Sequence, residues 1–530
     1  MVSELGEHVD SRTTSCGSIG TTYGAESASV VISQIQWCVS VNSIQDMRWN
    51  PVRASISQLA FVAVVCFFGV IAQAQQVPVQ SWITTTDEHG IVAGLEEQPS
   101  LAFGSNTEDS VPAIHVDEKI TYQRMEGGGA AFTDGAAWLI NEKLSAVQRD
   151  EVMKRLFDPV AGIGVSFLRN PIGSSDLTRE WYTLDDNAAD RHDPGLPHFS
   201  IDHDLADIIP LTLTARKLNS KLTLMINAWS PPAWMKSSGS LVAGDVLPQY
   251  YVHHANYFVK AIQAYEAHGL HVNYVSLNNE PTCCQDVNYP SLRTITSAEM
   301  ATMLKDYWFP AFEKNHLTTK ILLLDFNWSA ANLVEPLVAD SAIRNSPFVG
   351  GIAWHGYSGP PSIQSELHDR YGVEMFMTER SGFGAGSKQQ KQDMRDMVNV
   401  FRNWGKSFVK WPVATDENLG PYRGGCAICT GLVLVHTNDA RAGMVEYTTE
   451  YYTLGQYTKF VPNGAVRIQS DDNPKVLNVA FQNPDGSLVL IAYNDTADPQ
   501  RFKIVWHGRA LYATLPTNTS VSFEWRGDGK

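Results

Sequence analysis

Positive charge is scarce in this chain of 530 residues. Its 40 Lys and Arg stand against 56 Asp and Glu, so the formal net charge is −16 at pH 7, and no dense block of Lys or Arg reverses that balance locally. Phosphate backbones and anionic lipid surfaces attract positively charged proteins. The composition therefore argues against nucleic acid or an anionic membrane as the main partner.

The chain also lacks an apolar segment long enough for a stable membrane span. The uninterrupted run LAFVAVVCFFGVIA (59–72) has 14 residues, short of the roughly 20 that a bilayer requires. It follows the basic stretch MRWNPVR (47–53) and precedes the small-x-small sequence AQA (72–74), which is the order of a secretory signal. We therefore predict a signal peptide at 47–74, cleaved near Ala74, and a secreted or periplasmic protein. Residues 1–46 show no periodicity and are interpreted as a non-structural upstream extension.

Cysteines are few. Three of the seven fall in or before the predicted signal, and the other four form two close pairs: Cys283 with Cys284, and Cys426 with Cys429. Zinc sites usually take ligands from two pairs with C-x-x-C-like spacing, and adjacent cysteines make a poor half-site. The motifs DHD (202–204) and HH (253–254) lack further ligands at sensible spacing. We therefore predict no metal and favour a local disulfide at Cys426 and Cys429 in an oxidising compartment, although the sequence leaves the pairing open.

Two common functional signatures are missing. The chain has no G-x-S-x-G nucleophile elbow, which argues against a serine hydrolase. The segment GFGAGSK (382–388) departs from the phosphate-loop spacing, and no Ser or Thr follows its Lys. We interpret that segment as a loop and expect no cofactor.

The region 121–445 repeats one pattern: a short apolar run, a turn and a helical segment. The apolar runs are continuous rather than alternating, which is typical of strands buried on both faces of a parallel sheet. The stretch after MEGGGAAFTDG is one predicted strand, and seven more follow at 165–172, 221–229, 272–280, 320–328, 350–357, 373–381 and 407–416. Eight such units predict an α/β protein with a (β/α)8 TIM barrel, whose active site forms at the carboxyl ends of the strands.

Two helices of this region have clear boundaries in the sequence. TSAE (296–299) is a capping box, and apolar residues follow it at helical spacing: Met300, Met303, Leu304, Tyr307 and Trp308. The helix in NYFVKAIQAYEAHGL is predicted to end at Gly269.

The sequence changes character after about residue 445. Short strand-like segments follow one another, the first two separated by the turn NPDG: VLNVAFQ, SLVLIAYND, RFKIVWHG and SVSFEWRG. Alternate residues place Phe502, Ile504 and Trp506 on one face of their strand. The region 446–530 therefore predicts an antiparallel β-sandwich, to which the strand-like segment 75–120 contributes from the other side of the barrel.

Two glutamates interrupt apolar runs at predicted strand ends, Glu280 at strand four and Glu379 at strand seven. A charged residue in such a place is unfavourable unless it is paired, hydrated or used. An ion pair with an arginine such as Arg169 or Arg380 could explain either one alone, but less readily two at equivalent strand ends. Glycoside hydrolysis requires two carboxyl groups across a cleft: one protonates the leaving oxygen, and the other attacks the anomeric carbon or activates water.

Several motifs in the chain together resemble glycoside hydrolase family 30, the family of glucosylceramidases and β-1,6-glucanases. The resemblance runs from about 121 to the C-terminus and rests on GGAAFTDGAAWLI, FLRNPIGSSD, INAWSPPAWMKSSGSL, SLNNEP, IAWHGY, TERSG and LYATLPTNTSVSFEW. It implies a barrel with the acid/base on strand four and the nucleophile on strand seven. Glu280 would then be the acid/base and Glu379 the nucleophile, with net retention of configuration.

The same resemblance implies substrate contacts at further positions. Asn279 matches the amide that hydrogen-bonds the sugar 2-hydroxyl, and Asp176 and Trp229 match residues that hold the glycone. Arg169 would orient a carboxylate near the nucleophile. The other residues expected to line the pocket are Asp134, His355, Tyr357 and Trp411. Each also has an ordinary explanation, since a Trp on a strand is usually core and a single His usually a satisfied hydrogen-bond partner.

The chain departs from the family pattern near strand eight. Pro412 follows Trp411 where many relatives have Asn, and Tyr422 ends a GPY that replaces the Gly-Pro-Asn of glucosylceramidases. With GGCAIC, this loop is closer to secreted microbial members than to lysosomal glucosylceramidases, which weakens the case for ceramide as a substrate.

We therefore expect a secreted retaining β-glycosidase that hydrolyses β-glucosidic bonds of a carbohydrate or glycolipid by double displacement. One alternative is a β-xylosidase or β-fucosidase of the same family. Another is a catalytically inactive carbohydrate-binding protein on the same fold. The presence of both Glu280 and Glu379 argues against the second alternative.

Overall fold

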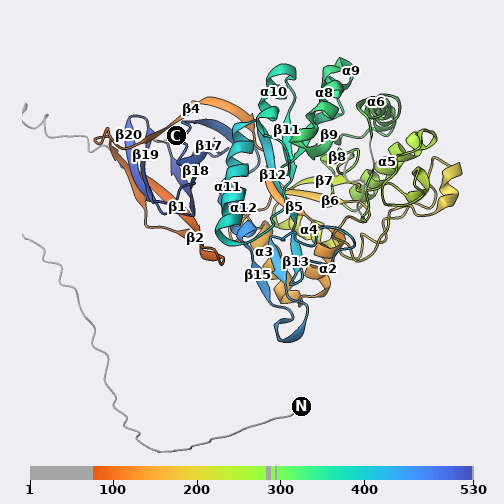
Figure 1. Ribbon diagram of the computed structural model, residues 1–530, viewed down its shortest axis with the longest axis horizontal. Helices are drawn as coiled ribbons and strands as arrows, with labels where there is room; N and C mark the ends of the chain where they lie inside the picture. Colours follow the sequence, from red (N-terminus) through yellow and green to blue (C-terminus); the bar gives the residue numbers. More distant parts are fainter. Residues whose placement is uncertain (1–75, 282–287, 293–294, 528–530) are drawn as a thin grey trace, which may run out of the picture. The chain divides into compact units, whose positions relative to one another are not determined.

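Figure 1 shows the computed structural model of the chain, which describes residues 76–281, 288–292 and 295–527. The predicted extension and signal peptide, and the pair Cys283 and Cys284, lie outside these residues. Within the described ranges, no helix is both long and apolar enough to cross a bilayer.

Eight parallel strands form a closed barrel, in which β12 pairs with β5 to complete the circle. The order around the barrel follows the chain, so the TIM-barrel prediction is confirmed. The first strand is Gly127–Ala131, inside MEGGGAAFTDG rather than after it as predicted, because helix α2 (Asp134–Glu142) occupies the stretch that follows. The strands are β5 (Gly127–Ala131), β6 (Phe167–Pro171), β7 (Thr223–Asn227), β8 (Tyr274–Ser276), β9 (Lys320–Asn327), β10 (Val349–His355), β11 (Met375–Glu379) and β12 (Gly405–Pro412).

Side chains from the strands fill the inside of the barrel. One residue from each of six strands packs into a common cluster, with Tyr274 of β8 against it: Phe167, Met225, Leu322, Ala353, Phe376 and Val409. All six are buried. The barrel is therefore a packed core, and chemistry is confined to its rim.

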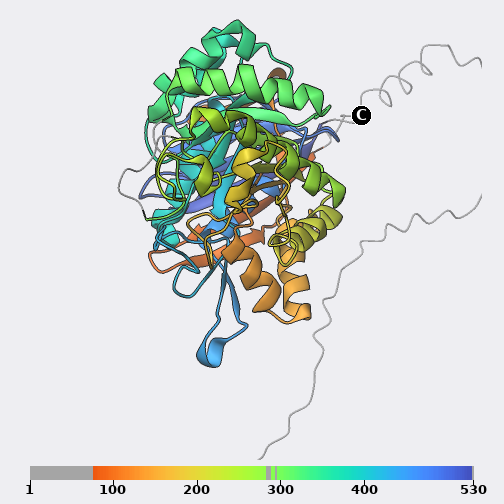
Figure 2. The same cartoon turned by 90° about the vertical axis from the view of Figure 1, so that its right-hand side faces the viewer.

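Helices follow the strands and surround the barrel (Figures 1 and 2). They are α2 (Asp134–Glu142), α3 (Ala146–Phe157), α4 (Ile208–Leu218), α5 (Tyr251–Ala267), α6 (Ser297–Thr302), α7 (Phe309–Lys314), α8 (Ala331–Ala339), α9 (Ser341–Arg344), α10 (Ser362–Tyr371), α11 (Gly386–Arg402) and α12 (Thr449–Thr458). Short 3-10 segments cover Ala188–His192, Ala233–Met235, Pro248–Tyr250, Trp328–Ala330 and Asp439–Arg441.

Both predicted helix boundaries are confirmed. The capping box forms between Thr296 and Glu299 at the start of α6. Gly269, with φ of +83°, follows the end of α5. The spacing after the capping box differs from the regular helix that was predicted, because Met303–Trp308 form a π-helix between α6 and α7. The wider turn still buries Met303 and Trp308.

Ten other strands form a second, largely antiparallel sheet. Its members are β1 (Val77–Thr86), β2 (Ile91–Glu97), β3 (Leu101–Ser105), β4 (Ala113–Arg124), β16 (Val466–Ser470), β17 (Val476–Gln482), β18 (Ser487–Asn494), β19 (Gln500–Trp506), β20 (Arg509–Leu515) and β21 (Thr519–Arg526). Phe502, Ile504 and Trp506 lie together in its core, as their alternation predicted. One pairing, between β4 and β19, is parallel rather than antiparallel.

A small three-stranded sheet follows the barrel and was not anticipated from the sequence. It consists of β13 (Ala414–Asp416), β14 (Val433–Val435) and β15 (Val445–Tyr447). The turn between β14 and β15 projects from the rest of the fold (Figures 1 and 2). The segment between β13 and β14 carries Cys426 and Cys429, and it returns to the carboxyl end of the barrel.

Candidate active site

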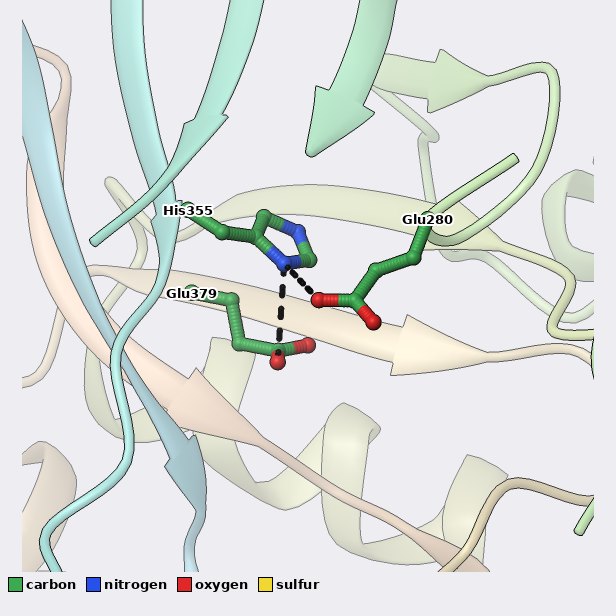
Figure 3. Close-up of side chains that lie close together, drawn as sticks. All are labelled: Glu280, His355 and Glu379. Atoms are coloured by element: carbon green, nitrogen blue, oxygen red, sulfur yellow. Dashed lines mark hydrogen bonds and ion pairs between the residues drawn. The ribbon is translucent and has the colours of Figure 1, made fainter. Parts of the chain in front are cut away.

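Glu280 and Glu379 meet at the carboxyl end of the barrel, where the sequence predicted them. Glu379 is the last residue of β11. The strand before Glu280 is shorter than predicted: β8 ends at Ser276, and Glu280 lies in a turn with φ of +43°. The Glu280 N–H donates to the Asp325 carbonyl at 3.0 Å. One oxygen of each carboxyl group lies within 4.8 Å of the other and of a His355 ring nitrogen (Figure 3).

Arg169, on β6, holds Glu379 directly. Its Nη1 donates to Glu379 Oε2 at 2.6 Å, and its Nη2 donates to Asp325 Oδ2 at 2.8 Å and to Asn279 Oδ1 at 2.6 Å. The guanidinium is fully buried. The resemblance implied that Arg169 orients a carboxylate near the nucleophile; the structure places it on Glu379 itself.

His355, at the end of β10, bridges the two glutamates. Its Nδ1 lies 2.9 Å from Glu280 Oε1 and 3.6 Å from Glu379 Oε1, and its Nε2 lies 3.1 Å from Asp325 Oδ1. Burial alone would lower the pKa of His355, but the nearby Glu379, Asp325 and Glu280 outweigh it and raise that pKa to about 9. The imidazole is therefore a cation at neutral pH and donates from both nitrogens.

Tyr357 donates its hydroxyl to Glu379 Oε1 at 2.8 Å, and the same hydroxyl lies 3.0 Å from Ser381 Oγ. Glu379 thus has a partner on each oxygen. Burial raises the pKa of Glu379, whereas His355 and Arg169 lower it and Glu280 raises it further. The net effect is a raised pKa of Glu379, and the like charge of Glu280 is one of its causes.

Asp325 is the residue of this network that the sequence analysis missed. It lies in β9 with a fully buried side chain, and it accepts from Ser276, Thr378, Arg169 and His355. Burial opposes its charge, but Arg169 and His355 lower its pKa below the usual range. The signal was present in KILLLDFNW, where a lone acid interrupts the apolar run of strand five.

A cavity of about 280 Å³ opens above these groups. Its walls contain both glutamates and come from several strand-end loops: Asp176, Trp229, Glu280, Tyr289, Asn327, Tyr357, Glu379, Ser381, Phe383, Trp411, Cys426 and Cys429. Trp229 and Trp411 pack with ring centroids 5.0 Å apart, and Tyr289 meets Trp229 edge-on at 5.8 Å. An aromatic wall beside carboxyl groups suits a sugar, which has apolar C–H faces and hydroxyl edges.

Asp176 lies in that wall as the resemblance implied. Burial and the nearby Glu379 raise its pKa to about 7. Its Oδ2 accepts from the Cys426 N–H at 3.2 Å, and its Oδ1 has no hydrogen-bond partner among the residues that the structure describes. Further wall residues were not predicted from the sequence: Tyr289, Asn327, Ser381 and Phe383. Asn327 ends β9, and the other three lie in loops, whose shape local sequence patterns do not determine.

Asp134 lies elsewhere than predicted. It begins α2, and Arg179 binds its carboxylate, with Nη2 at 2.6 Å from Oδ1 and the Arg179 N–H at 2.8 Å from Oδ2. It is absent from the cavity walls. The ion pair satisfies the carboxylate at the start of the helix, so Asp134 supports the loop after β6 rather than lining the pocket.

Glu280, His355 and Glu379 have the spacing of metal ligands, although the sequence predicted no metal. A metal-binding imidazole must be neutral on the coordinating nitrogen. His355 is instead a cation whose Nδ1 faces both carboxyl groups. The arrangement fits a hydrogen-bonded acid pair better than a metal centre.

The cysteines near this cavity form a disulfide between Cys426 and Cys429, with Cα atoms 5.5 Å apart. This confirms the local disulfide that the sequence favoured, whereas Cys283 and Cys284 lie outside the described residues.

The chain matches known proteins along most of its described length. Residues 125–422 match the glycosyl hydrolase family 30 TIM-barrel domain, and residues 464–523 match the glycosyl hydrolase family 30 β-sandwich domain. Endo-1,6-beta-D-glucanase BGN16.3 of Trichoderma harzianum is 30% identical over 430 residues, covering 77% of this chain and 82% of that protein. Lysosomal acid glucosylceramidase of Mus musculus is 25% identical over 441 residues, covering 76% and 82%.

Solved structures agree on the fold. The endo-beta1,6-glucanase BT3312 superposes with a TM-score of 0.76 at 24% identity, covering 85% of this chain and 99% of that one. SrfJ from Salmonella typhimurium superposes with a TM-score of 0.77 at 23% identity, covering 85% and 100%. The barrel-domain match alone spans more than half of the chain. The chain therefore belongs to glycoside hydrolase family 30 and is an O-glycosyl hydrolase.

Proposed function

We propose that this protein is a retaining β-glycosidase that hydrolyses β-glucosidic bonds by double displacement, with Glu379 as nucleophile and Glu280 as acid/base. The observation that carries the proposal is the proximity of the two carboxyl groups, with oxygens within 4.8 Å of each other. Retaining enzymes place these groups about 5–5.5 Å apart, whereas inverting enzymes leave about 6.5–9.5 Å for a water molecule.

The roles follow from the partners of each glutamate. Two cations, Arg169 and His355, lie against Glu379. The first step requires Glu379 as a carboxylate and Glu280 as the proton donor, and both cations favour the ionised form of Glu379. Glu379 also accepts from the Tyr357 hydroxyl, which fixes its direction. Glu280 lies nearer the rim, so a leaving group and then water can reach it.

In the first step Glu379 attacks the anomeric carbon while Glu280 protonates the departing oxygen. The covalent glycosyl-enzyme forms and the aglycone leaves. In the second step Glu280 removes a proton from water, which attacks the same carbon and releases Glu379. Two inversions give net retention. As negative charge leaves Glu379 in the first step, Arg169 keeps its contact with Asp325, so the guanidinium remains compensated.

The activities named for the relatives guide which substrates we propose for this chain. Endo-1,6-β-glucanases of Trichoderma harzianum and Aspergillus fumigatus are 30% and 29% identical to this chain, and the mouse glucosylceramidase is 25% identical. We therefore propose β-1,6-linked glucan as the first substrate and β-glucosides with lipid aglycones as the second. β-Xylosides and β-fucosides are the remaining glycones to compare.

A substrate panel tests this proposal. The purified protein is assayed on β-1,6-glucan, glucosylceramide and aryl β-glucosides, β-xylosides and β-fucosides, beside Glu280→Gln and Glu379→Gln. We expect the highest kcat/KM on gluco-configured substrates. Preference for a xyloside or fucoside would move the assignment to the alternative glycones. Binding of glucan without turnover would support the inactive carbohydrate-binding protein.

Azide distinguishes the two glutamates. With Glu280→Ala, an aryl glucoside that has a good leaving group still forms the glycosyl-enzyme, and azide then attacks it to give the β-glucosyl azide. With Glu379→Ala no such intermediate forms. Azide can then only displace the aglycone directly, which gives the α-glucosyl azide. β-Glucosyl azide from the Glu379 variant together with α-glucosyl azide from the Glu280 variant would reverse the assigned roles.

We also propose that the protein is exported after cleavage near Ala74. The disulfide between Cys426 and Cys429 supports this, because such bonds persist in oxidising compartments. N-terminal sequencing of protein from culture supernatant should begin at Gln75. Full-length protein retained in the cytoplasm would contradict it.

A further inference from the structure

The disulfide between Cys426 and Cys429 lies in the wall of the active cavity. Cys429 is buried, and Cys426 is partly exposed. A disulfide that closes so short a loop removes little entropy from the unfolded chain compared with one that closes a long loop. Stabilisation of the fold therefore does not by itself explain why this disulfide lies beside the active site.

The first contact of this loop is with Asp176. The Cys426 N–H donates to Asp176 Oδ2 at 3.2 Å, and the Arg423 N–H donates to the Asp176 carbonyl at 3.0 Å. A Cβ atom at Gly425 would lie 2.0 Å from the Asp176 Cβ. Only glycine permits this approach, so the loop backbone packs directly on the side chain and main chain of Asp176.

The second contact is with the loop that follows the nucleophile. Ser381 Oγ lies 3.1 Å from the Cys429 sulfur and 3.0 Å from the Tyr357 hydroxyl, which in turn donates to Glu379. The Thr430 N–H donates to the Gly382 carbonyl at 3.0 Å. The disulfide thus supports the chain of contacts that ends at Glu379.

The third contact is with the loop after strand four. Gly424 has φ of +71°, and a Cβ atom there would lie 1.8 Å from the Asn288 carbonyl oxygen. The neighbouring Tyr289 forms part of the cavity wall. The segment 424–430 therefore touches loops from three barrel strands, each of which contributes a wall residue.

We propose that the disulfide loop 424–430 is a positioning element, which holds Asp176 and Ser381 in place and thereby sets the affinity of the site for its sugar ring. The inference rests on the proposed glycosidase function and extends it to residues that do not themselves react. Asp176 is the residue through which most of the effect passes, because the loop contacts it through both backbone and side chain.

A double-mutant cycle tests this proposal on an aryl β-glucoside. The variant with Cys426→Ala and Cys429→Ala is compared with wild type, in the native background and in Asp176→Asn; Ala427→Ser, an exposed change between the cysteines, is the control. We expect the cysteine change to lower kcat/KM at least tenfold, mainly through KM, and less than threefold in the Asp176→Asn background. An equal factor in both backgrounds, or a change under twofold in the first, would overturn the proposal.

Reduction provides a second measurement in case the double variant folds poorly. Dithiothreitol converts the disulfide to two thiols and is itself oxidised to its cyclic disulfide, so the electrons balance. We expect reduction to raise KM in wild type, reoxidation to restore it, and dithiothreitol to leave the cysteine variant unchanged. An unaltered KM in reduced wild type would contradict the proposal.

The proposed function and this inference can fail separately. Absence of turnover by oxidised wild type on every substrate of the panel would count against the proposed function alone. Calorimetric binding of a gluco-configured iminosugar, with and without the disulfide, then measures the loop's effect on affinity. Equal affinities would overturn the inference.

Discussion

Arg169 Nη1 lies 2.6 Å from Glu379 Oε2, and both side chains are buried at the carboxyl end of the barrel. The same guanidinium also binds Asp325. The charge of the buried guanidinium is balanced by two carboxylates, Asp325 and Glu379. Each of these buried carboxylates in turn has the guanidinium as its counter-charge. The ion pairs connect β6, β9 and β11 across the barrel rim.

Arg169→Met should destabilise the protein by about 3–5 kcal/mol, because it leaves buried Asp325 and Glu379 without their cation. Urea denaturation followed by tryptophan fluorescence measures this. Arg395→Met is the matched control: the Arg395 side chain is half exposed where it pairs with Asp495, and the pair should contribute less than about 1 kcal/mol. Equal losses in the two variants would show that the buried pairing is not what stabilises the rim.

Tyr357→Phe should lower kcat by about tenfold to a hundredfold and leave the fold intact, since it removes one hydrogen bond to the ionised Glu379. The ring is retained, so packing against Phe383 persists. Steady-state kinetics on an aryl glucoside, with circular dichroism, is the measurement. Tyr371→Phe, whose hydroxyl meets Glu335 away from the cavity, should match wild type. An unchanged kcat in Tyr357→Phe would show that the Tyr357 hydroxyl does not assist the nucleophile.

Asp204→Asn should flatten the pH dependence of stability between about pH 4 and pH 7. Burial raises the pKa of Asp204 to about 7, although Tyr182 and Tyr265 donate to it. Its unfolded pKa is near 4, so in this window the folded protein binds more protons than the unfolded chain. The free energy of unfolding therefore falls as pH rises from 4 to 7. Chemical denaturation at a series of pH values measures the slope.

Asp340→Asn is the control for that experiment. Asp340 pairs with exposed Lys305, and its pKa is lowered, so its contribution changes below pH 4 and not above it. An Asp204→Asn variant that keeps the full wild-type slope would show that another group supplies it.

Lys236→Met should weaken the loops after strands three and four. The buried ammonium donates to Ser230 Oγ, the Leu241 carbonyl and the Ser291 carbonyl at 2.9, 2.8 and 2.6 Å. Its loss leaves buried acceptors unpaired, which costs about 1–3 kcal/mol. Because Ser291 is close in sequence to Tyr289, KM should rise more than kcat falls.

Lys305→Met, on the surface, is the matched control for Lys236→Met and should leave both stability and KM near wild type. Denaturation and kinetics are measured on the same preparations. A Lys236→Met enzyme with wild-type KM would mean that the two loops hold their shape without the ammonium.

The fold was largely predictable because its signals are local. Continuous apolar runs at regular spacing give parallel strands, and the alternation of Phe502, Ile504 and Trp506 gives the sandwich face. The sheet β13–β15 was missed, because short strands in long connections have no periodicity of their own. The parallel pairing of β4 with β19 was missed, because the pattern within a strand does not determine which strand lies beside it. The π-helix at Met303–Trp308 was missed because it keeps nearly the same residues buried.

The site was predictable where charge interrupts an apolar run. Glu280 and Glu379 stood out for that reason, and Asp325 carried the same signal within strand five. Asp134 was expected in the pocket, but it forms an ion pair with Arg179, which lies in the loop after β6. The sequence around Asp134 does not indicate this partner. The contact between Asp176 and Gly425 depends on how two distant loops fold together, which no local pattern encodes.

The anomer released first in hydrolysis tests the central claim most directly. Proton NMR follows an aryl β-glucoside, or whichever panel substrate turns over fastest, with Glu379→Gln as control. If Glu379 attacks and Glu280 delivers the proton, the β-anomer appears first and mutarotates later, and the control releases neither anomer. Initial release of the α-anomer, or unchanged turnover by Glu379→Gln, would contradict the double-displacement account.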